Sequence, residues 1–182
     1  MTSPVDPGIA PRLARVRLLL LDVDGVLTDG SISLTGSGDE SKTFHVRDGV
    51  GVRLWQEAGN AVGIVTGRSS RAVARRAEEL GIGHVRQGVG DKVAAAEEIM
   101  GACGVPWAET ASIGDDLPDI LLARRAGVSF AVADACAELR GVATLVTHLP
   151  GGRGAVREAV ECLMAARGGW ETAVARYRGG IA

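Results

Sequence analysis

The chain has 182 residues, of which 46% are hydrophobic and 23% charged, with 20 Lys and Arg against 22 Asp and Glu. These proportions are typical of one folded globular domain and exclude a disordered or fibrous chain. The formal net charge of -2 argues against a protein that binds nucleic acid mainly through its phosphates. Cys103, Cys136 and Cys162 lack the spacing of a zinc site, so we expect free thiols and no disulfide framework.

The two ends of the chain differ in character from its middle. Residues 1–15 begin with a proline-rich stretch that has no apolar core of a signal peptide, so we expect a flexible tail. No apolar run is long enough to span a membrane, and a cytoplasmic location is the resulting expectation. Residues 168–182 are expected to form a C-terminal tail, which leaves one domain over residues 16–167.

Short apolar runs alternate with helical patterns through this domain, starting with a strand over residues 17–22 and a β-hairpin over residues 31–46. The hairpin is indicated by two alternating runs on either side of a Gly-rich turn. Strands are then expected over residues 60–65, 84–87, 110–114, 128–132 and 145–147, and helices over residues 50–58, 69–80, 92–103, 117–126 and 154–166. Repeated strand-then-helix units predict an α/β domain with a mostly parallel sheet.

Acidic, hydroxyl and basic side chains follow the expected strands, where parallel sheets bind their ligands. They are Asp22 and Asp24 after the first strand, Thr66 after the second, Lys92 at the start of a helix, and Asp115 and Asp116 after the fourth strand. Any one of the acids or Thr66 taken alone is equally suited to capping a helix. Four acids, a hydroxyl and a lysine at one edge of the sheet favour a functional site.

The chemistry of this set is that of phosphoryl transfer. Clustered carboxylates repel each other and need a cation, and a set of oxygen ligands alone favours Mg²⁺. A carboxylate can attack phosphorus and form an acyl-phosphate, while Thr66, the amides after it and Lys92 can neutralise the phosphoryl group. Asp24 is placed to give a proton to the leaving oxygen and later to take one from water. The set predicts a Mg²⁺-dependent reaction through a covalent aspartyl intermediate.

Four segments in this region resemble the motifs of the haloacid dehalogenase superfamily, in its phosphatase branch. They are residues 22–30 (DVDGVLTDG), residues 64–67 (IVTG), Lys92 and residues 114–119 (GDDLPD), in the order of the superfamily. The resemblance implies a Rossmann-like three-layer sandwich with a β-hairpin flap after the first strand. The segments between the motifs are too short for the cap domain that many members carry, so a capless member is expected.

The same resemblance implies a role for each motif residue. Asp22 is then the nucleophile and a Mg²⁺ ligand, and Asp24 is the general acid/base, which also offers its backbone carbonyl to the metal. Asp115 is a further Mg²⁺ ligand, and Asp116 acts on the metal through water. The phosphoryl group is held by Thr66, Gly67 and Lys92, and Asp119 orients Lys92.

Further segments narrow the resemblance to the capless phosphatases of 3-deoxy-D-manno-octulosonate (KDO) 8-phosphate, which act in lipopolysaccharide biosynthesis. These segments are residues 44–49 (FHVRDG), 66–68 (TGR), 131–135 (AVADA) and 151–158 (GGRGAVRE). The resemblance implies a sugar-acid phosphate as substrate and a homotetramer with shared active sites. No nucleic-acid or membrane partner is expected.

Three arginines are candidates for binding the sugar acid: Arg68, Arg47 and Arg153. Arg can bind a carboxylate through two parallel hydrogen bonds, although surface arginines are commonly just solvated. A sister group that acts on nine-carbon 9-phosphates tends to have Glu after the Thr-Gly pair. Arg68 at this position therefore favours the eight-carbon substrate.

Three other functions stay open at this point. They are a nonulosonate (sialic-acid-type) 9-phosphate phosphatase, a broad small-molecule phosphatase of the same superfamily, and a non-enzymatic homologue that binds a sugar phosphate. The last would be expected to lack the nucleophile or the acid/base, whereas Asp22 and Asp24 are both present. The sequence has neither a Walker loop (GxxxxGK[ST]) nor a GxGxxG motif after a strand, so it does not support a nucleotide-binding alternative.

Overall fold

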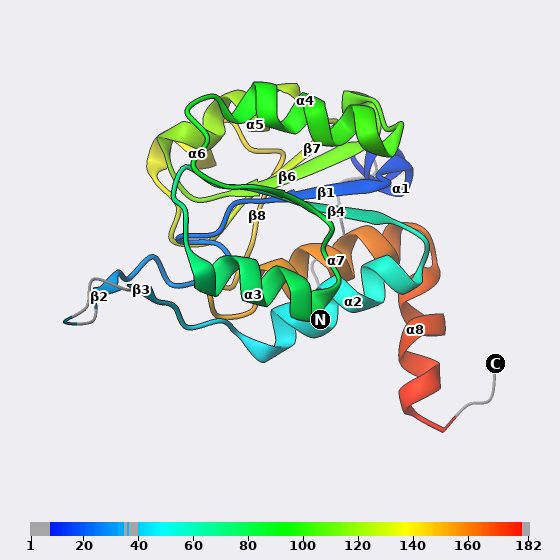
Figure 1. The fold of residues 1–182 in the computed structure, drawn as a ribbon. Coiled ribbons are helices and arrows are strands. Elements are labelled where there is room, and N and C mark those ends of the chain that lie inside the picture. Colours follow the sequence, from blue (N-terminus) through cyan, green and yellow to red (C-terminus); the bar gives the residue numbers. More distant parts are fainter. Residues whose placement is uncertain (1–7, 35, 37–39, 180–182) are drawn as a thin grey trace.

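A computed structural model describes residues 8–34, 36 and 40–179 of the chain. Its middle layer is a six-stranded sheet with the order β5-β4-β1-β6-β7-β8 (Figure 1). Every neighbouring pair in this sheet is parallel, which confirms the predicted α/β class. The strands are β1 (Leu18–Leu21), β4 (Ala61–Val65), β5 (His84–Arg86), β6 (Thr110–Gly114), β7 (Val128–Ala131) and β8 (Leu145–Val146).

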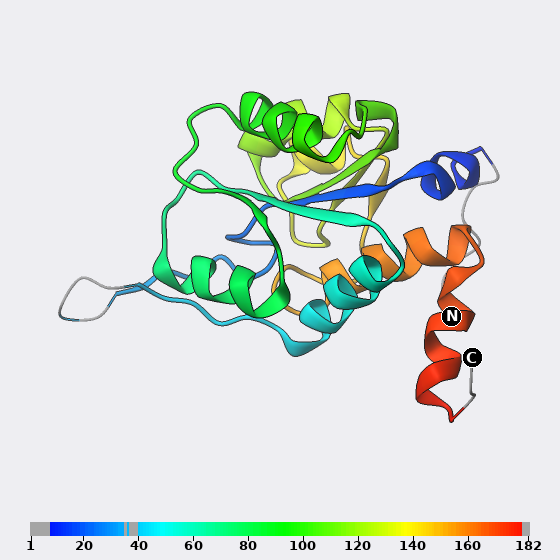
Figure 2. The same ribbon diagram turned by 45° about the vertical axis from the view of Figure 1, so that its right-hand side comes forward.

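Helices cover both faces of the sheet and complete the three layers (Figures 1 and 2). One face carries α2 (Val46–Glu57), α3 (Arg71–Leu80) and α7 (Ala155–Ala166), and the other carries α4 (Lys92–Cys103) and α5 (Ile120–Arg125). The remaining helical elements are α1 (Ala10–Arg15), η1 (Trp107–Glu109), η2 (Leu117–Asp119), α6 (Ala137–Arg140) and α8 (Gly169–Tyr177). None of the helices in the described ranges is long and apolar enough to cross a membrane.

The central strand β1 shows why this sheet requires cover on both faces. Leu19 and Leu21 belong to the apolar cluster formed with α2 and α7, whereas Leu18 and Leu20 belong to the cluster formed with α4. All four side chains are buried. An apolar run without alternation is the pattern of a strand packed on both sides, so this segment positions Asp22 at the end of the most buried strand.

Helix α2 begins at Val46, four residues before the predicted start. Glycines in its first turns lower the helix propensity of this segment, so the sequence alone favours a later start. In the fold they permit close packing, because a Cβ at Gly51 would lie 3.1 Å from Cα of Arg157 on α7. The buried Asp48 accepts hydrogen bonds from the amides of Gly154 (3.2 Å) and Arg157 (2.8 Å), which joins α2 to the start of α7.

The predictions for the next two helices are close to the structure. Ser70, the residue after the predicted start at 69, caps α3, since its hydroxyl accepts a hydrogen bond from the amide of Ala72 at 3.3 Å. Helix α3 ends at Leu80, as predicted, because Gly81 follows with a φ of 69°, in the left-handed region that suits glycine. The predicted bounds of α4, residues 92–103, are confirmed.

The predicted flexible tail is wrong for residues 10–15, which form α1. Leu13 is fully buried and Pro11 lies in the first turn, where proline is compatible with a helix. Residues 1–7 lie outside the described residues. In the predicted C-terminal tail, Gly169–Tyr177 form α8, and the Arg157 guanidinium lies 4.8 Å from the ring centre of Trp170.

The predicted hairpin is present as β2 (Ser33–Leu34) and β3 (Glu40–Ser41), which pair antiparallel. Its expected end at residue 46 overlaps the start of α2, and residues 35 and 37–39 lie outside the described residues. The hairpin projects from the sheet as a small flap (Figure 1). Among the described residues, the hairpin, α2 and β4 separate the first two motifs, and α3 and β5 precede Lys92, so no cap domain is present there.

Candidate active site

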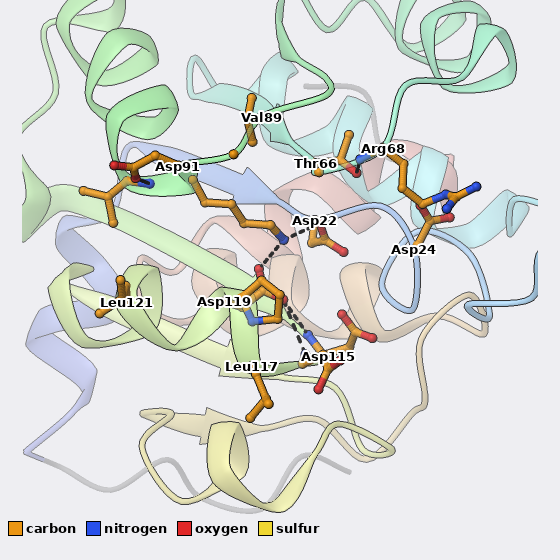
Figure 3. Close-up of a pocket in the computed structure, with 16 residues that line it drawn as sticks. Asp22, Asp24, Thr66, Arg68, Val89, Asp91, Asp115, Leu117, Asp119 and Leu121 are labelled. Carbon is orange, nitrogen blue, oxygen red and sulfur yellow. Dashed lines mark hydrogen bonds and ion pairs between the residues drawn. The ribbon is translucent and has the colours of Figure 1, made fainter.

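A cavity of about 720 Å³ lies at the carboxyl ends of β1, β4 and β6 (Figure 3). This is where the strand order reverses, because β4 and β5 lie on one side of β1 and β6 to β8 lie on the other. Open α/β sheets bind ligands at such a switch point. The predicted residues that line the cavity are Asp22, Asp24, Thr66, Gly67, Arg68, Lys92, Asp115, Asp116 and Asp119.

Lys92 lines this cavity, and its ammonium group pairs with two buried carboxylates. It is 2.7 Å from Oδ1 of Asp22 and 2.6 Å from Oδ1 of Asp119 (Figure 3). Burial of the ammonium opposes its charge, but attraction to the two carboxylates exceeds that effect and raises the pKa of Lys92. Lys92 therefore stays protonated. Its position depends on Asp91, which caps α4 by accepting hydrogen bonds from the amides of Val93 and Ala94.

Asp119 links Lys92 to the loop after β6. Its Oδ2 accepts hydrogen bonds from the amides of Asp115 (3.1 Å) and Asp116 (3.4 Å), while its Oδ1 binds Lys92. The side chain is buried. Because both oxygens of Asp119 already accept hydrogen bonds, its carboxylate is fixed in place and can orient Lys92, as predicted.

Three carboxylates form a compact acidic cluster beside Lys92. Oxygens of Asp22, Asp115 and Asp119 all lie within 4.8 Å of one another. The close approach depends on Gly25, which has a φ of 88° and whose Cβ would lie 2.0 Å from Oδ2 of Asp115. Oxygen donors of this kind are the ligands that Mg²⁺ prefers, so the cluster fits the predicted cation.

The charges of the cluster oppose each other. Burial, which exceeds the attraction of Lys92, raises the pKa of Asp22 to about 6. Burial and repulsion by Asp22 and Asp119 raise the pKa of Asp115 to about 7. Of the other two acids predicted at the metal, Asp116 is exposed, and the carboxylate of Asp24 pairs with Lys42 outside the cluster.

These raised pKa values predict how the stability of the metal-free protein depends on pH. Between pH 4 and 7, Asp115 holds a proton in the folded chain but loses it in the unfolded chain, so folding takes up protons and stability falls as pH rises. After discounting for partial exposure, we expect a loss of about 2 kcal/mol from this residue. Urea unfolding with a chelator at pH 5 and pH 8 measures it.

Asp115→Asn is the matched variant for this prediction, and it should show a smaller fall of stability across the same range. Added Mg²⁺ should restore the stability of the wild type at pH 8. A wild-type profile that is flat, or that rises with pH, would contradict the raised pKa of Asp115 in the folded protein.

Thr66 and Gly67 form the wall of the cavity at the end of β4. The side chain of Thr66 is buried, and its Oγ1 accepts a hydrogen bond from the amide of Arg68 at 3.4 Å. Because the Thr66 oxygen accepts this hydrogen bond, its hydroxyl hydrogen stays available to donate to a ligand in the cavity. Figure 3 shows Thr66 on the side of Asp22 opposite to Asp115. A phosphoryl group between these walls would meet a hydroxyl, an amide and the Lys92 ammonium.

The three candidate arginines lie in different places. Arg68 lines the cavity, pairs with Glu40 and has its Nε 3.8 Å from Oδ2 of Asp24. Arg47 lines a separate cavity of about 530 Å³ beside α7. Arg153 is exposed, with an Nη2 3.7 Å from Oδ2 of Asp29. Within this chain, the fold brings Arg68 to the cavity that contains the acidic cluster and leaves the other two arginines outside that cavity.

Two charged residues of the hairpin were not among the predicted site residues. Lys42 forms an ion pair with Asp24, and Glu40 pairs with both Lys42 and Arg68. Their spacing of two along an extended segment puts both side chains on one face, and this pattern is visible in the sequence. The sequence alone does not show that the face with Glu40 and Lys42 packs against the first motif.

Comparisons with known proteins agree with this geometry. A family model for haloacid dehalogenase-like hydrolases matches residues 85–154. The chain is 42% identical to the 3-deoxy-D-manno-octulosonate 8-phosphate phosphatase of Salmonella typhimurium, over 91% of this chain and 88% of that protein. It is 41% identical to the Escherichia coli K12 enzyme of the same name, with the same coverage.

Solved structures show the same relationship. The phosphatase of this name from Yersinia pestis superposes with a TM-score of 0.90 at 42% identity, covering 92% of this chain and 91% of that one. The one from Moraxella catarrhalis, solved with magnesium, phosphate and KDO, gives 0.91 at 39% identity, covering 93% and 98%. The chain therefore belongs to the haloacid dehalogenase-like hydrolases, in the family of the 3-deoxy-D-manno-octulosonate 8-phosphate phosphatases.

Proposed function

We propose that this protein is a Mg²⁺-dependent phosphatase that hydrolyses KDO 8-phosphate to KDO and inorganic phosphate. The observation that carries the chemistry is the contact of Lys92 with both Asp22 and Asp119 beside Asp115. The substrate is proposed from the relatives and from the position of Arg68. Mg²⁺ would be held by Asp22, Asp115 and the backbone carbonyl of Asp24, with Asp116 acting through water. The ion would offset the repulsion between the attacking carboxylate and the negatively charged phosphate.

In the first half-reaction, the Asp22 carboxylate attacks the phosphorus atom. Lys92 binds Oδ1 of Asp22, so the other oxygen is the one that is free to attack. The new bond joins this oxygen to phosphorus, and the bond between phosphorus and the sugar oxygen breaks. Asp24 donates its proton to that leaving oxygen, which departs as the sugar alcohol. Thr66, the amide of Gly67 and Lys92 stabilise the phosphoryl oxygens.

In the second half-reaction, water attacks the phosphorus of the aspartyl-phosphate. Asp24 is now ionised and accepts a proton from that water, so it returns to its starting state. The bond between Asp22 and phosphorus breaks, inorganic phosphate leaves and the carboxylate is regenerated. Each half-reaction uses the same two aspartates, which explains why both follow the central strand two residues apart.

The proposed substrate carries a carboxylate far from its phosphate. Arg68 lies at the rim of the cavity, where its side chain is 45% exposed. A guanidinium at this position can bind the sugar carboxylate through two parallel hydrogen bonds while the phosphate lies against Thr66 and Lys92. This selection by Arg68 is part of the proposal.

Phosphate release on three substrates tests the function. KDO 8-phosphate, a nonulosonate 9-phosphate and p-nitrophenyl phosphate are compared with Mg²⁺ and with a chelator. We expect the kcat/KM for KDO 8-phosphate to exceed the other two by about 10²-fold, and activity to vanish without the metal. Arg68→Met should lower the kcat/KM for KDO 8-phosphate and leave that for the aryl phosphate little changed.

Arg75→Met is the matched control, since Arg75 is an exposed arginine on α3 outside the cavity. A preference for the 9-phosphate would replace the proposed substrate with that of the sister group. Equal activity on all three substrates would indicate a broad small-molecule phosphatase, and no release with Mg²⁺ would favour a binding protein.

We propose in addition that the chain forms a homotetramer with shared active sites, as the family resemblance implies. Ile32 and Leu34 of the hairpin are 53% and 67% exposed, and Val46 of α2 is 76% exposed. Large apolar side chains that stay exposed are candidates for an interface between subunits. Light scattering after size exclusion measures the mass in solution. A cytoplasmic location stays a prediction from the sequence.

A further inference from the structure

Lys42 is a buried lysine that the mechanism above leaves without a role. Its side chain is 2% exposed, although it directly follows the short strand β3 of a projecting hairpin. Lysine is almost never fully buried unless it is paired. The ammonium contacts Oδ1 of Asp24 and lies 3.5 Å from Oε2 of Glu40, so two carboxylates compensate its charge.

The carboxylate of Asp24 is held from one side. Oδ1 contacts Lys42, whereas Oδ2 is buried and has no hydrogen-bond donor among the described residues. Arg68 is the nearest other cation, with its Nε 3.8 Å from Oδ2, beyond hydrogen-bond distance. A buried carboxylate oxygen without a donor has an unmet capacity for a hydrogen bond. Oδ2 is therefore the oxygen that can carry the proton which Asp24 gives to the leaving oxygen of a substrate.

Glu40 connects this pair to the rim of the cavity. Its Oε1 accepts a hydrogen bond from Arg68, and its Oε2 faces Lys42. Without the ammonium, the carboxylates of Asp24 and Glu40 would face the same buried space, and Asp24 would keep only Arg68, whose Nε lies beyond hydrogen-bond distance of Oδ2. Like charges in such a space disfavour each other, so Asp24 would be expected to rotate away. The arrangement therefore makes Lys42 the contact on which the position of Asp24 depends.

We propose that Lys42 is a positioning residue for catalysis: it holds the Asp24 carboxylate in the orientation from which Asp24 protonates the leaving oxygen. The inference rests on the proposed function, because Asp24 acts as an acid only in that reaction. It assigns the flap a part in the chemistry, since the same hairpin segment carries Glu40 and Lys42. Lys42 itself does not touch the reacting atoms.

The test compares leaving groups. A reactive aryl phosphate such as p-nitrophenyl phosphate needs little protonation of its leaving oxygen, whereas a simple alkyl phosphate needs it strongly. Lys42→Met keeps most of the length of the side chain and removes its charge. We expect its kcat/KM on alkyl phosphates to fall by about 10²-fold, and that on p-nitrophenyl phosphate by less than about threefold. Lys42→Arg should recover most of the lost activity on the alkyl substrates.

Two further variants serve as the positive and the negative control. Asp24→Asn should show the same selective loss, and Arg17→Met, which removes an exposed cation at the opposite end of β1, should show none. If Lys42→Met does not fold, the same comparison is made on Lys42→Leu, whose side chain also has no group that can donate to Asp24. Equal losses on both substrate types, a change in KM alone, or no loss would each overturn the proposal.

The use of simple phosphates separates this inference from the choice of substrate. If the wild type hydrolyses alkyl and aryl phosphates but shows no preference for KDO 8-phosphate, the proposed substrate fails while the result for Lys42 still stands. If Asp24→Asn shows no selective loss, Asp24 is not the acid, and the role of Lys42 falls with it.

Discussion

Asp22→Asn should abolish phosphate release and leave the fold intact. We expect kcat to fall by about 10⁴-fold or more, as for removal of a nucleophile in other enzymes with covalent intermediates. An amide cannot replace the carboxylate that attacks phosphorus. The side chain keeps its shape, and its Oδ1 can still accept the hydrogen bond from Lys92 that the wild type has at 2.7 Å.

The stability of this variant makes the result specific. Burial raises the pKa of Asp22 to about 6, so the buried charge opposes folding at neutral pH and its removal should not destabilise the metal-free protein. Thermal melting with a chelator measures this, and acid quenching of the wild type during turnover should trap the aspartyl-phosphate. The control for loss of one charge is Glu97→Gln, because Glu97 is an exposed carboxylate on α4. Turnover retained by Asp22→Asn would overturn the assignment of the nucleophile.

Lys92→Met should affect activity and stability together. Its ammonium is the shared partner of Asp22 and Asp119, at 2.7 and 2.6 Å, and both carboxylates are buried. Removing one partner of a buried ion pair leaves uncompensated charge, for which we expect a loss of about 3 kcal/mol at pH 8 in metal-free protein. The kcat should fall by about 10²-fold or more, because a donor to the phosphoryl group is lost.

The loss of stability in Lys92→Met should depend on pH. At pH 5, Asp22 takes up a proton in the folded variant and no longer carries an unpaired charge, so the variant should approach the wild type. Urea unfolding at both pH values measures the difference. Arg125→Met removes the exposed partner of Glu97, and such surface pairs contribute about 1 kcal/mol or less. An equally small effect of Lys92→Met at pH 8 would show that its charge is not needed there.

The sequence predicted most of the sheet because its inner strands are buried on both faces. The run Leu18–Leu21 has no alternation, which is the pattern of a covered parallel strand. The ends of helices were less certain where tertiary contacts compensate a poor local signal. Helix α2 begins at Val46 despite its glycines, because Gly51 lets α2 approach α7 and Asp48 binds the first turn of α7.

The chain ends illustrate the same limit. The prolines before residue 12 indicate an irregular tail, yet α1 forms because Leu13 is buried in the core with α7. Burial of one large apolar side chain exceeds a weak local preference. The sequence contains no sign of the surface on which Leu13 packs.

The sequence by itself determined the chemistry of this protein. The order and type of Asp22, Asp24, Thr66, Lys92 and Asp115 predicted phosphoryl transfer, because side-chain chemistry depends on residue type and the strand ends of a parallel sheet converge. Only the tertiary structure decided which charges meet. It separated Arg47 and Arg153 from Arg68 and directed Lys42 of the flap onto Asp24, whereas the contact of Lys92 with Asp119 was already expected from the family resemblance. Such pairings depend on how segments far apart in the chain pack, and no local pattern carries that information.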